Sequence, residues 1–298
     1  MTFLLRVAKE KKKETEKAKN MMTEFFITLH PLFTEVHQKV VLKYLQSPRP
    51  LSKAEWTEAL TAFDLLSLSL IHYEGRSQTF KRFYEEEIEQ KYASLLITDL
   101  LEMKDVENEG ARRAFALFEQ ARADLEEKGL RDPLTVEERL LLAFCTYWWG
   151  SFAKGYITEI TIFQDLEKEG IQFQAHDILS QEGRFSSWDL IVEGMEGDIK
   201  SSTYFLYTSR SFPLRHTFYI TSLYNQNKRE YLRVVVLKES AWHEINGETV
   251  PTTLEQVWGV FPGAGEISFK EQRLIVVEYE LWKVKIKALQ KRRRQENE

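Results

Sequence analysis

The stretch Phe185–Thr203, FSSWDLIVEGMEGDIKSST, predicts a β-hairpin that carries charged side chains. Its first arm, from Trp188 to Val192, is rich in residues that favour strands, and Gly194 with Gly197 marks a turn. Asp198-Ile199-Lys200 then restarts an extended run. Because successive residues of a strand point to opposite faces, Asp198 and Lys200 are expected to share one face.

Whether Asp189 joins this face depends on the length of the turn. A loop of two residues at Glu193-Gly194 places Asp189 opposite Asp198, whereas a loop of four residues, from Glu193 to Glu196, places it opposite Lys200. Any loop of even length keeps the three side chains on one face, and an odd loop or a bulge does not. Both even registers stay open at this point.

The charged side chains on this face need a bound partner if they are buried. Two carboxylates, Asp189 and Asp198, and the ammonium group of Lys200 are costly to bury among apolar strands without one. A hard divalent cation suits the acids, because Mg²⁺ takes a few carboxylate oxygens and leaves its other positions to water and substrate phosphates. The hairpin therefore predicts a cation site.

At these residues the chain resembles the PD-(D/E)xK nucleases, the restriction-endonuclease-like superfamily. The signature of that superfamily is an acid on one strand and acid-any-Lys on the next, here Asp189 followed by Asp198-Ile199-Lys200. Trp188 replaces the usual Pro, and Asp198 replaces the commoner Glu. Members also commonly carry a Glu on the preceding helix, and Glu159 is the matching residue. The resemblance covers about residues 135–242.

Glu159 stands on the apolar face of the helix expected before these strands. Phe152, Tyr156, Glu159, Phe163 and Leu166 recur at spacings of four, three, four and three residues, so Glu159 shares a face with bulky apolar side chains. A carboxylate there is unusual for a helix that only packs. The alternative is that Glu159 pairs with a Lys or caps a backbone group.

The resemblance implies metal-dependent hydrolysis of phosphodiester bonds, in DNA more often than in RNA. In this interpretation Asp189, Asp198 and the backbone carbonyl of Ile199 bind Mg²⁺ or Mn²⁺, and Glu159 completes the site directly or through water. Lys200 orients the attacking water and offsets phosphate charge. The competing interpretation is that Asp189 and Asp198 merely flank a turn and that Lys200 is a charge at a strand edge.

Polar and basic residues after the motif are close enough in sequence to contact a phosphate backbone, which positions a strand without reading its bases. These residues are Ser201, Ser202, Thr203, Arg210, Arg215, Lys228 and Arg229. An exonuclease branch of the superfamily carries Gln-x-x-x-Tyr after the Lys. Gln226 and Tyr231 are one residue too far apart for that motif, so the sequence does not indicate that branch. We expect an endonuclease rather than an exonuclease.

The composition is that of a globular protein with a large core, since 43% of the 298 residues are hydrophobic and 13% are aromatic. A net charge of −5 does not exclude a nucleic-acid partner, because local basic faces set the local potential. Cys145 is the single cysteine, so no intramolecular disulfide forms, and no Cys/His cluster has zinc spacing. No apolar run is long enough to act as a signal peptide or to span a membrane, so we expect a cytoplasmic protein without membrane partners.

We expect an α+β protein with two domains. A helical domain over residues 1–133 precedes a restriction-endonuclease-like α/β domain over residues 134–298 with a central mixed sheet. Gly75 is expected to end a helix within the first domain. The capping-box sequence Thr135–Glu138 opens the helix that carries Glu159, and Gly150 and Gly155 are expected to bend or split that helix.

After Gly170 the pattern changes from helices to strands. Strands are expected at Ile171–Ile178, in the hairpin, at Thr217–Tyr224 and at Tyr231–Lys238. A helix, three strands, a short connection and two further strands form an α/β order that is compatible with the nuclease resemblance.

The helical domain shows no DNA-reading motif, and we expect it to bind a partner, to form a homodimer or to control access to the site. Two further hypotheses remain. One is a nuclease-like fold with an unused site, acting as a structural or protein-interaction subunit of a nucleic-acid-processing complex. The other is a helical interaction protein with a small appended β domain.

Overall fold

The computed structural model describes residues 26–46, 53–73, 75–127, 135–180, 183, 186–202, 205, 214–225, 230–246 and 274–297. The chain forms two compact units, one of residues 1–96 and 113–151 and the other of residues 97–112 and 152–298. The domain boundary predicted at residue 133 falls within residues 128–134, which lie outside the described part of the chain.

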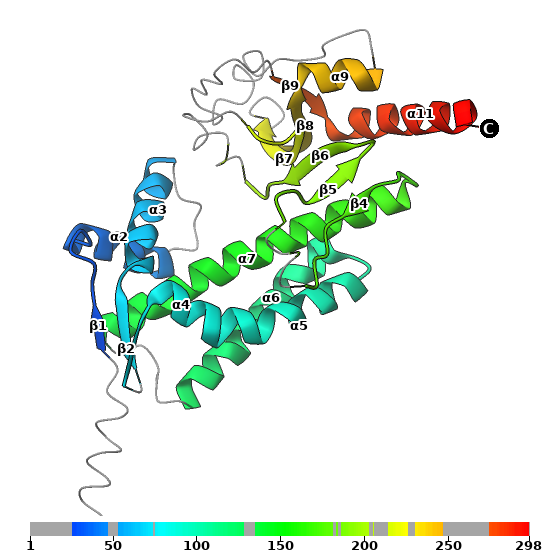
Figure 1. Ribbon diagram of the computed structural model, residues 1–298. Coiled ribbons are helices and arrows are strands. Elements are labelled where there is room, and N and C mark those ends of the chain that lie inside the picture. The colour runs from blue at the N-terminus through cyan, green and yellow to red at the C-terminus, as the bar shows by residue number, and fades with distance from the viewer. Residues whose placement is uncertain are drawn as a thin grey trace, which may run out of the picture. The chain divides into compact units, whose positions relative to one another are not determined.

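Helices predominate in the first half of the chain (Figure 1). Their packing follows the apolar stripes of the sequence, and Phe63, for example, is fully buried and stacks on Tyr147 with ring centroids 4.2 Å apart. The helices are α2 (Glu35–Gln46), α3 (Lys53–Ser67), α4 (Phe80–Tyr84), the π-helix η1 (Glu85–Glu89), α5 (Gln90–Glu102), α6 (Val106–Glu127) and α7 (Val136–Lys168).

A small antiparallel sheet in this region was not predicted. It consists of β1 (Phe26–Thr28), β2 (Leu70–Tyr73) and β3 (Arg76–Thr79), in that order. Gly75 does not simply end a helix, because α3 already stops at Ser67. With a φ of 72°, Gly75 lies in the turn between β2 and β3, where a left-handed backbone favours glycine.

Helix α7 begins with the predicted capping box. The Thr135 backbone amide donates to Glu138 Oε2 at 2.8 Å, and the Glu138 amide donates to Thr135 Oγ1 at 3.2 Å. The prediction that Gly150 and Gly155 split this helix is wrong, since α7 continues through both positions. Packing elsewhere on the helix outweighs the weak helix propensity of two glycines.

The second unit contains a mixed sheet in the order β4-β5-β6-β7-β8-β9 (Figure 1). Strands β6 and β7 are parallel, and the other neighbouring strands are antiparallel. A helical first half followed by a mixed sheet confirms the α+β prediction at this level. The strands are β4 (Gln174–Ala175), β5 (Leu190–Val192), β6 (Met195–Ile199), β7 (Phe218–Asn225), β8 (Glu230–Lys238) and β9 (Leu274–Glu278).

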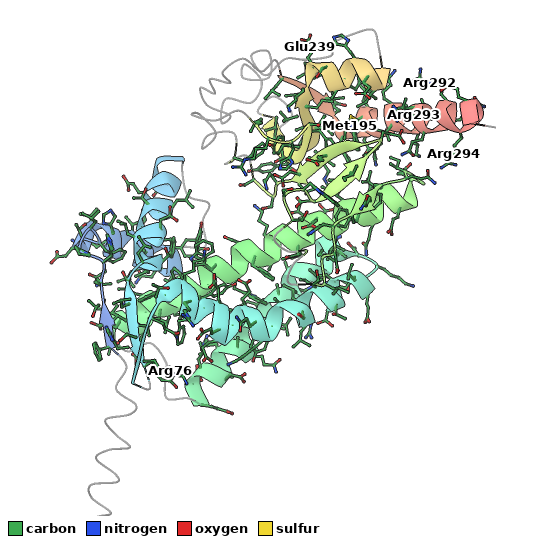
Figure 2. All side chains as sticks on the ribbon, viewed as in Figure 1. Arg76, Met195, Glu239, Arg292, Arg293 and Arg294 are labelled. Atoms are coloured by element: carbon green, nitrogen blue, oxygen red, sulfur yellow. The ribbon has the colours of Figure 1, made fainter. Side chains whose placement is uncertain are left out.

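Two helices that pack on this sheet were not predicted as such, α9 (Glu239–Asn246) and α11 (Tyr279–Asn297) (Figure 1). The Trp282 indole of α11 is fully buried, and its ring centroid lies 5.4 Å from that of Phe218 on β7. Lys283 of α11 donates to Asp165 of α7 at 2.7 Å, which ties α11 to the helix that carries Glu159. Near the other end of α11, Arg293 donates to Glu193 at 2.7 Å, in the turn that precedes Met195 (Figure 2).

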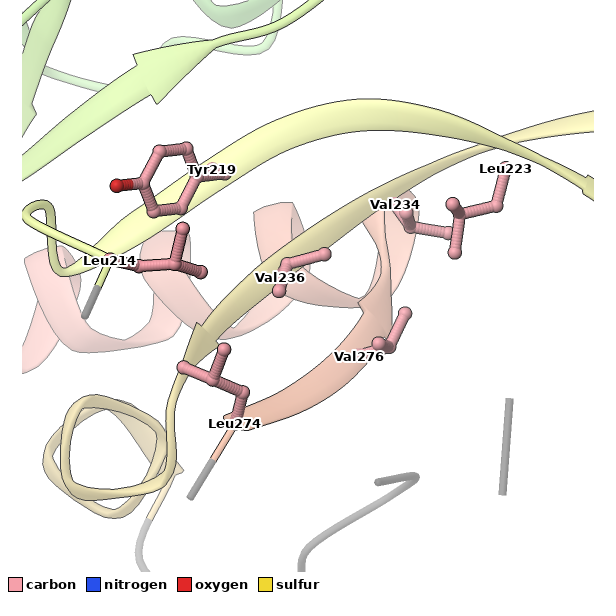
Figure 3. Close-up of a cluster of buried hydrophobic side chains, with 7 residues drawn as sticks. All are labelled: Leu214, Tyr219, Leu223, Val234, Val236, Leu274 and Val276. Atoms are coloured by element: carbon pink, nitrogen blue, oxygen red, sulfur yellow. The ribbon is translucent and has the colours of Figure 1, made fainter. Parts of the chain in front are cut away.

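An apolar cluster joins β7, β8 and β9 (Figure 3). Tyr219 of this cluster is the register partner of Asp198 on the neighbouring parallel strand, so the two side chains leave the sheet on the same face. The acids of the hairpin therefore lie at the edge of this buried apolar cluster. The cluster consists of Leu214, Tyr219, Leu223, Val234, Val236, Leu274 and Val276.

Among the described residues, no helix combines the length and the apolar character that crossing a membrane requires.

Candidate metal centre

The hairpin formed by β5 and β6 has a turn of two residues. Leu190 pairs with Gly197 and Val192 with Met195, which leaves Glu193 and Gly194 as the loop. Both loop residues have a left-handed backbone, with φ of 53° and 80°, as a tight hairpin turn of the primed type requires. Of the two turn lengths that the sequence left open, the structure has the shorter one, and Asp189 directly precedes the pair formed by Leu190 and Gly197.

Glycine at position 197 allows β6 to pack closely against the side chain of Phe218 on β7. A Cβ atom at Gly197 would lie 2.1 Å from Cζ of Phe218, so only glycine lets the aromatic ring pass this close to the strand. The ring is in turn packed against Trp282. Gly197 and Asp198 point to opposite faces, so the aromatic packing on one face supports the acid on the other.

Asp189 precedes β5 directly and is held by three contacts. Its backbone amide donates to the carbonyl of Gly197 at 3.0 Å, and its own carbonyl accepts from the amide of His176 at 3.1 Å. Its side-chain Oδ2 accepts a 2.6 Å hydrogen bond from the amide of Ile199. The backbone of Asp189 is therefore held by Gly197 and His176, and its carboxylate is held by the amide of Ile199.

Glu159 of α7 is buried, at 8% exposure, and reaches the hairpin. Its Oε1 is hydrogen-bonded to Nε2 of His176, which follows β4. One donor atom from each of Glu159, His176 and Asp189 lies within 4.8 Å of the other two, so these three residues could hold a metal ion. The hydrogen-bond partner of Glu159 is a histidine, and not the Lys or backbone group of the alternative interpretation.

Two side chains of this site have shifted pKa values. Burial, followed by the negative charges of Asp198 and Glu159, raises the pKa of the Asp189 carboxyl to about 8. Burial by itself lowers the pKa of the His176 imidazole, but hydrogen bonds to Glu159 and Gly183 outweigh it and raise that pKa to about 9. Both shifts favour the protonated form of the side chain.

Asp198 has a different set of neighbours. Nζ of Lys200, which directly follows β6, donates to Oδ1 of Asp198 at 2.6 Å. His216 Nε2 lies 3.9 Å from its Oδ2, and burial holds the pKa of this imidazole below its usual value. Asp198 is buried, but the side chain of Lys200 is 40% exposed, so the ammonium group faces solvent at the edge of the site.

The structure thus brings together Glu159, Asp189, Asp198 and Lys200. Of the residues predicted to contact phosphate, Ser201 is half-buried, and Ser202 and Arg215 are exposed. Thr203, Arg210, Lys228 and Arg229 lie outside the described residues.

Sequence reasoning missed His176 and His216. His176 lies 17 residues from Glu159, and no motif spacing connects the two. The one available signal was a polar residue at the end of the Ile171–Ile178 strand pattern, next to a hairpin that already carried acids. His216 had the comparable signal of directly preceding the strand pattern that begins at Thr217.

The donor atoms fit a divalent cation. Carboxylates from α7 and the hairpin converge in a largely buried place, where a carboxylate without a partner is costly. No family model, curated protein or solved structure matches this chain.

Proposed function

We propose that this protein is a metal-dependent nuclease that hydrolyses phosphodiester bonds, with DNA preferred over RNA. The observation that carries the proposal is the geometry of the hairpin, in which the Ile199 amide donates to the Asp189 carboxylate and Lys200 pairs with Asp198 at the solvent edge. An acid, a second acid and a Lys arranged in this way form the constellation that the resemblance to the PD-(D/E)xK nucleases implies.

Asp189, Asp198 and the backbone carbonyl of Ile199 would hold Mg²⁺ or Mn²⁺, and Glu159 would complete the site directly or through a water molecule. A bound cation of this kind lowers the pKa of water and neutralises charge that develops on the phosphate. The hydrogen bond from the Ile199 amide to Asp189 keeps the first acid in place for this task.

Lys200 would act at the entrance of the site. Its ammonium group is held by Asp198 and is partly open to solvent, where a phosphate group can approach. From there it would orient the attacking water and offset the negative charge of the phosphate. Ser201, Ser202 and Arg215 are near in sequence and would position the nucleic-acid backbone without reading bases.

Purified full-length protein incubated with plasmid, linear double-stranded DNA, single-stranded DNA and RNA tests the proposal, in Mg²⁺, in Mn²⁺ and in EDTA. We expect cleavage of DNA in at least one metal, including internal cuts in closed plasmid, and none in EDTA. Asp189→Asn should abolish cleavage. Glu196→Gln, a change at an exposed acid on β6, should preserve it.

The absence of cleavage on all substrates in both metals would contradict the proposal. It would favour the alternative of an inactive nuclease-like subunit of a larger complex. Cleavage that survives both EDTA and Asp189→Asn would instead point to a contaminating enzyme.

A further inference from the structure

His176 is oriented as a metal-binding histidine usually is. Its Nδ1 lies 2.7 Å from the backbone carbonyl of Gly183. A carbonyl oxygen can only accept, so Nδ1 must carry a hydrogen, and Nε2 is the atom left to face Glu159 and Asp189. Histidine ligands of metals typically donate their other ring N–H to such a carbonyl, which fixes the ring and its tautomer.

The three donor atoms have the separation that a shared cation needs. Those of Glu159, His176 and Asp189 all lie within 4.8 Å of one another. Ligand bonds of ~2.1 Å put donor atoms on opposite sides of an ion ~4.2 Å apart. Small side-chain movements therefore suffice to close the three donors around one ion, and the His176 side chain is only 6% exposed.

The charges of the three side chains also suit a divalent cation. When both Glu159 and Asp189 are ionised, a protonated His176 offsets only one of the two carboxylates. A divalent cation bound to a neutral imidazole offsets both. The Nε2–H bond then breaks, its proton passes to solvent, and its electron pair binds the ion.

We propose that His176 is a ligand of the cation, through Nε2 and together with Glu159 and Asp189, and that this nitrogen makes the site prefer Mn²⁺ to Mg²⁺. Mg²⁺ selects oxygen ligands and gives up its water reluctantly, whereas first-row transition ions accept imidazole. This inference rests on the proposed nuclease's cation site and assigns that site a donor outside the acid-any-Lys motif.

Pulsed electron paramagnetic resonance of bound Mn²⁺ tests the inference directly, because a coordinated imidazole nitrogen modulates the electron spin echo. We expect ¹⁴N modulation in the wild-type protein with less than one equivalent of Mn²⁺. Incorporation of ¹⁵N-histidine should replace it with the ¹⁵N pattern, a test that needs no mutation. Stoichiometric Mn²⁺ binding without histidine nitrogen coupling would overturn the inference.

Two variants identify the histidine. His176→Gln should remove the nitrogen coupling and weaken Mn²⁺ binding by ~10-fold or more, with a smaller change for Mg²⁺. His216→Gln is the matched control, since His216 is the other buried histidine near the acids, and it should keep the coupling. Loss of coupling in His216→Gln alone would assign the ligand to His216 and reject His176.

Calorimetry and cleavage assays separate this inference from the proposed function. Nitrogen coupling in a protein that cuts no nucleic acid would support His176 as a ligand and contradict the nuclease proposal. Metal-dependent cleavage by a protein without nitrogen coupling would support the nuclease and contradict the role of His176. Equal affinity of the wild-type protein for Mn²⁺ and Mg²⁺ would overturn the predicted selectivity.

Discussion

Oδ2 of Asp189 accepts a 2.6 Å hydrogen bond from the backbone amide of Ile199, the residue between Asp198 and Lys200. The acid of the first strand is thus tied to the middle of the acid-any-Lys sequence on the second. The backbone of the hairpin sets the relative positions of the two acids before any cation binds. A site held in this way loses little conformational entropy when it binds an ion.

Asp198 and Lys200 should affect metal binding and cleavage differently. Asp198→Asn keeps the shape of the side chain but removes the charge that a hard cation requires, so we expect loss of both Mn²⁺ affinity and cleavage. Lys200→Ala removes no metal ligand. It should reduce the cleavage rate by ~100- to 1,000-fold, the usual cost of losing one group that stabilises developing charge.

Calorimetry and single-turnover cleavage measure the two effects side by side. Removal of the Lys200 ammonium from Asp198 should leave metal affinity equal or higher, because a positive charge beside the acids is lost. Circular dichroism should show that both variants are folded. If Lys200→Ala cleaves at the wild-type rate, the assignment of the acid-any-Lys sequence is wrong.

Glu159→Gln should weaken Mn²⁺ binding by at least ~10-fold and slow cleavage, because the carboxylate that faces both His176 and Asp189 is removed. The measurement is a Mn²⁺ titration monitored by calorimetry. Glu167→Gln is the matched control, since Glu167 is an exposed acid on the same helix, α7. Wild-type affinity in Glu159→Gln would remove Glu159 from the metal centre.

The metal-free protein should lose stability as the pH rises. Although burial opposes it, hydrogen bonding to Glu159 and Gly183 raises the pKa of His176 from 6.5 to about 9. The protonated imidazole therefore contributes fully to folding stability below its unfolded-state pKa, and this contribution is lost as the pH rises through about 9. Asp189, with its pKa raised to about 8, acts in the same direction.

Thermal unfolding in EDTA at about pH 6 and about pH 10 checks this dependence. As the pH rises between these values, we expect the melting temperature of the wild-type protein to fall more than that of His176→Gln. His243→Gln changes a half-exposed histidine on α9 and should follow the wild-type curve. If the melting temperatures of the wild-type protein and His176→Gln change equally with pH, this result would contradict the ion pair between His176 and Glu159.

Gly197→Ala should destabilise the protein by ~1–3 kcal/mol or more, the usual cost of overpacking a core. The added methyl group would meet the ring of Phe218, which cannot move freely because it packs against Trp282. Chemical denaturation measures the loss. Gly150→Ala is the control, since nothing lies within 4 Å of a Cβ at this exposed position of α7, and it should stabilise the helix by up to ~1 kcal/mol.

Local sequence determined the hairpin. Strand-forming residues on both sides of Glu193-Gly194 define a turn whose backbone only a few residue types adopt readily, and the alternation of side chains then places Asp198 and Lys200 on one face. The helical capping box at Thr135 and the strands β7 and β8 were predictable for the same reason. Each depends on residues that are close together in the chain.

The sequence by itself left two lengths for the hairpin turn, and the tertiary structure has the turn of two residues. Close packing of Gly197 on Phe218 and the hydrogen bond from Ile199 to Asp189 accompany that choice. The tertiary structure also turned Leu70–Tyr73 into β2, where the sequence suggested a continuing helix. An apolar run of this length suits either structure, and pairing with β1 and β3 decided between them.

Only the tertiary structure brought His176 to the acids. The β4–β5 pairing sets His176 beside Asp189, and the packing of α7 brings Glu159 to the same place. Contacts between segments this far apart follow from how a sheet and a helix pack, and no spacing within the sequence encodes them. The acid-any-Lys motif could therefore be predicted from the sequence, whereas the position of His176 beside Glu159 and Asp189 depended on the fold.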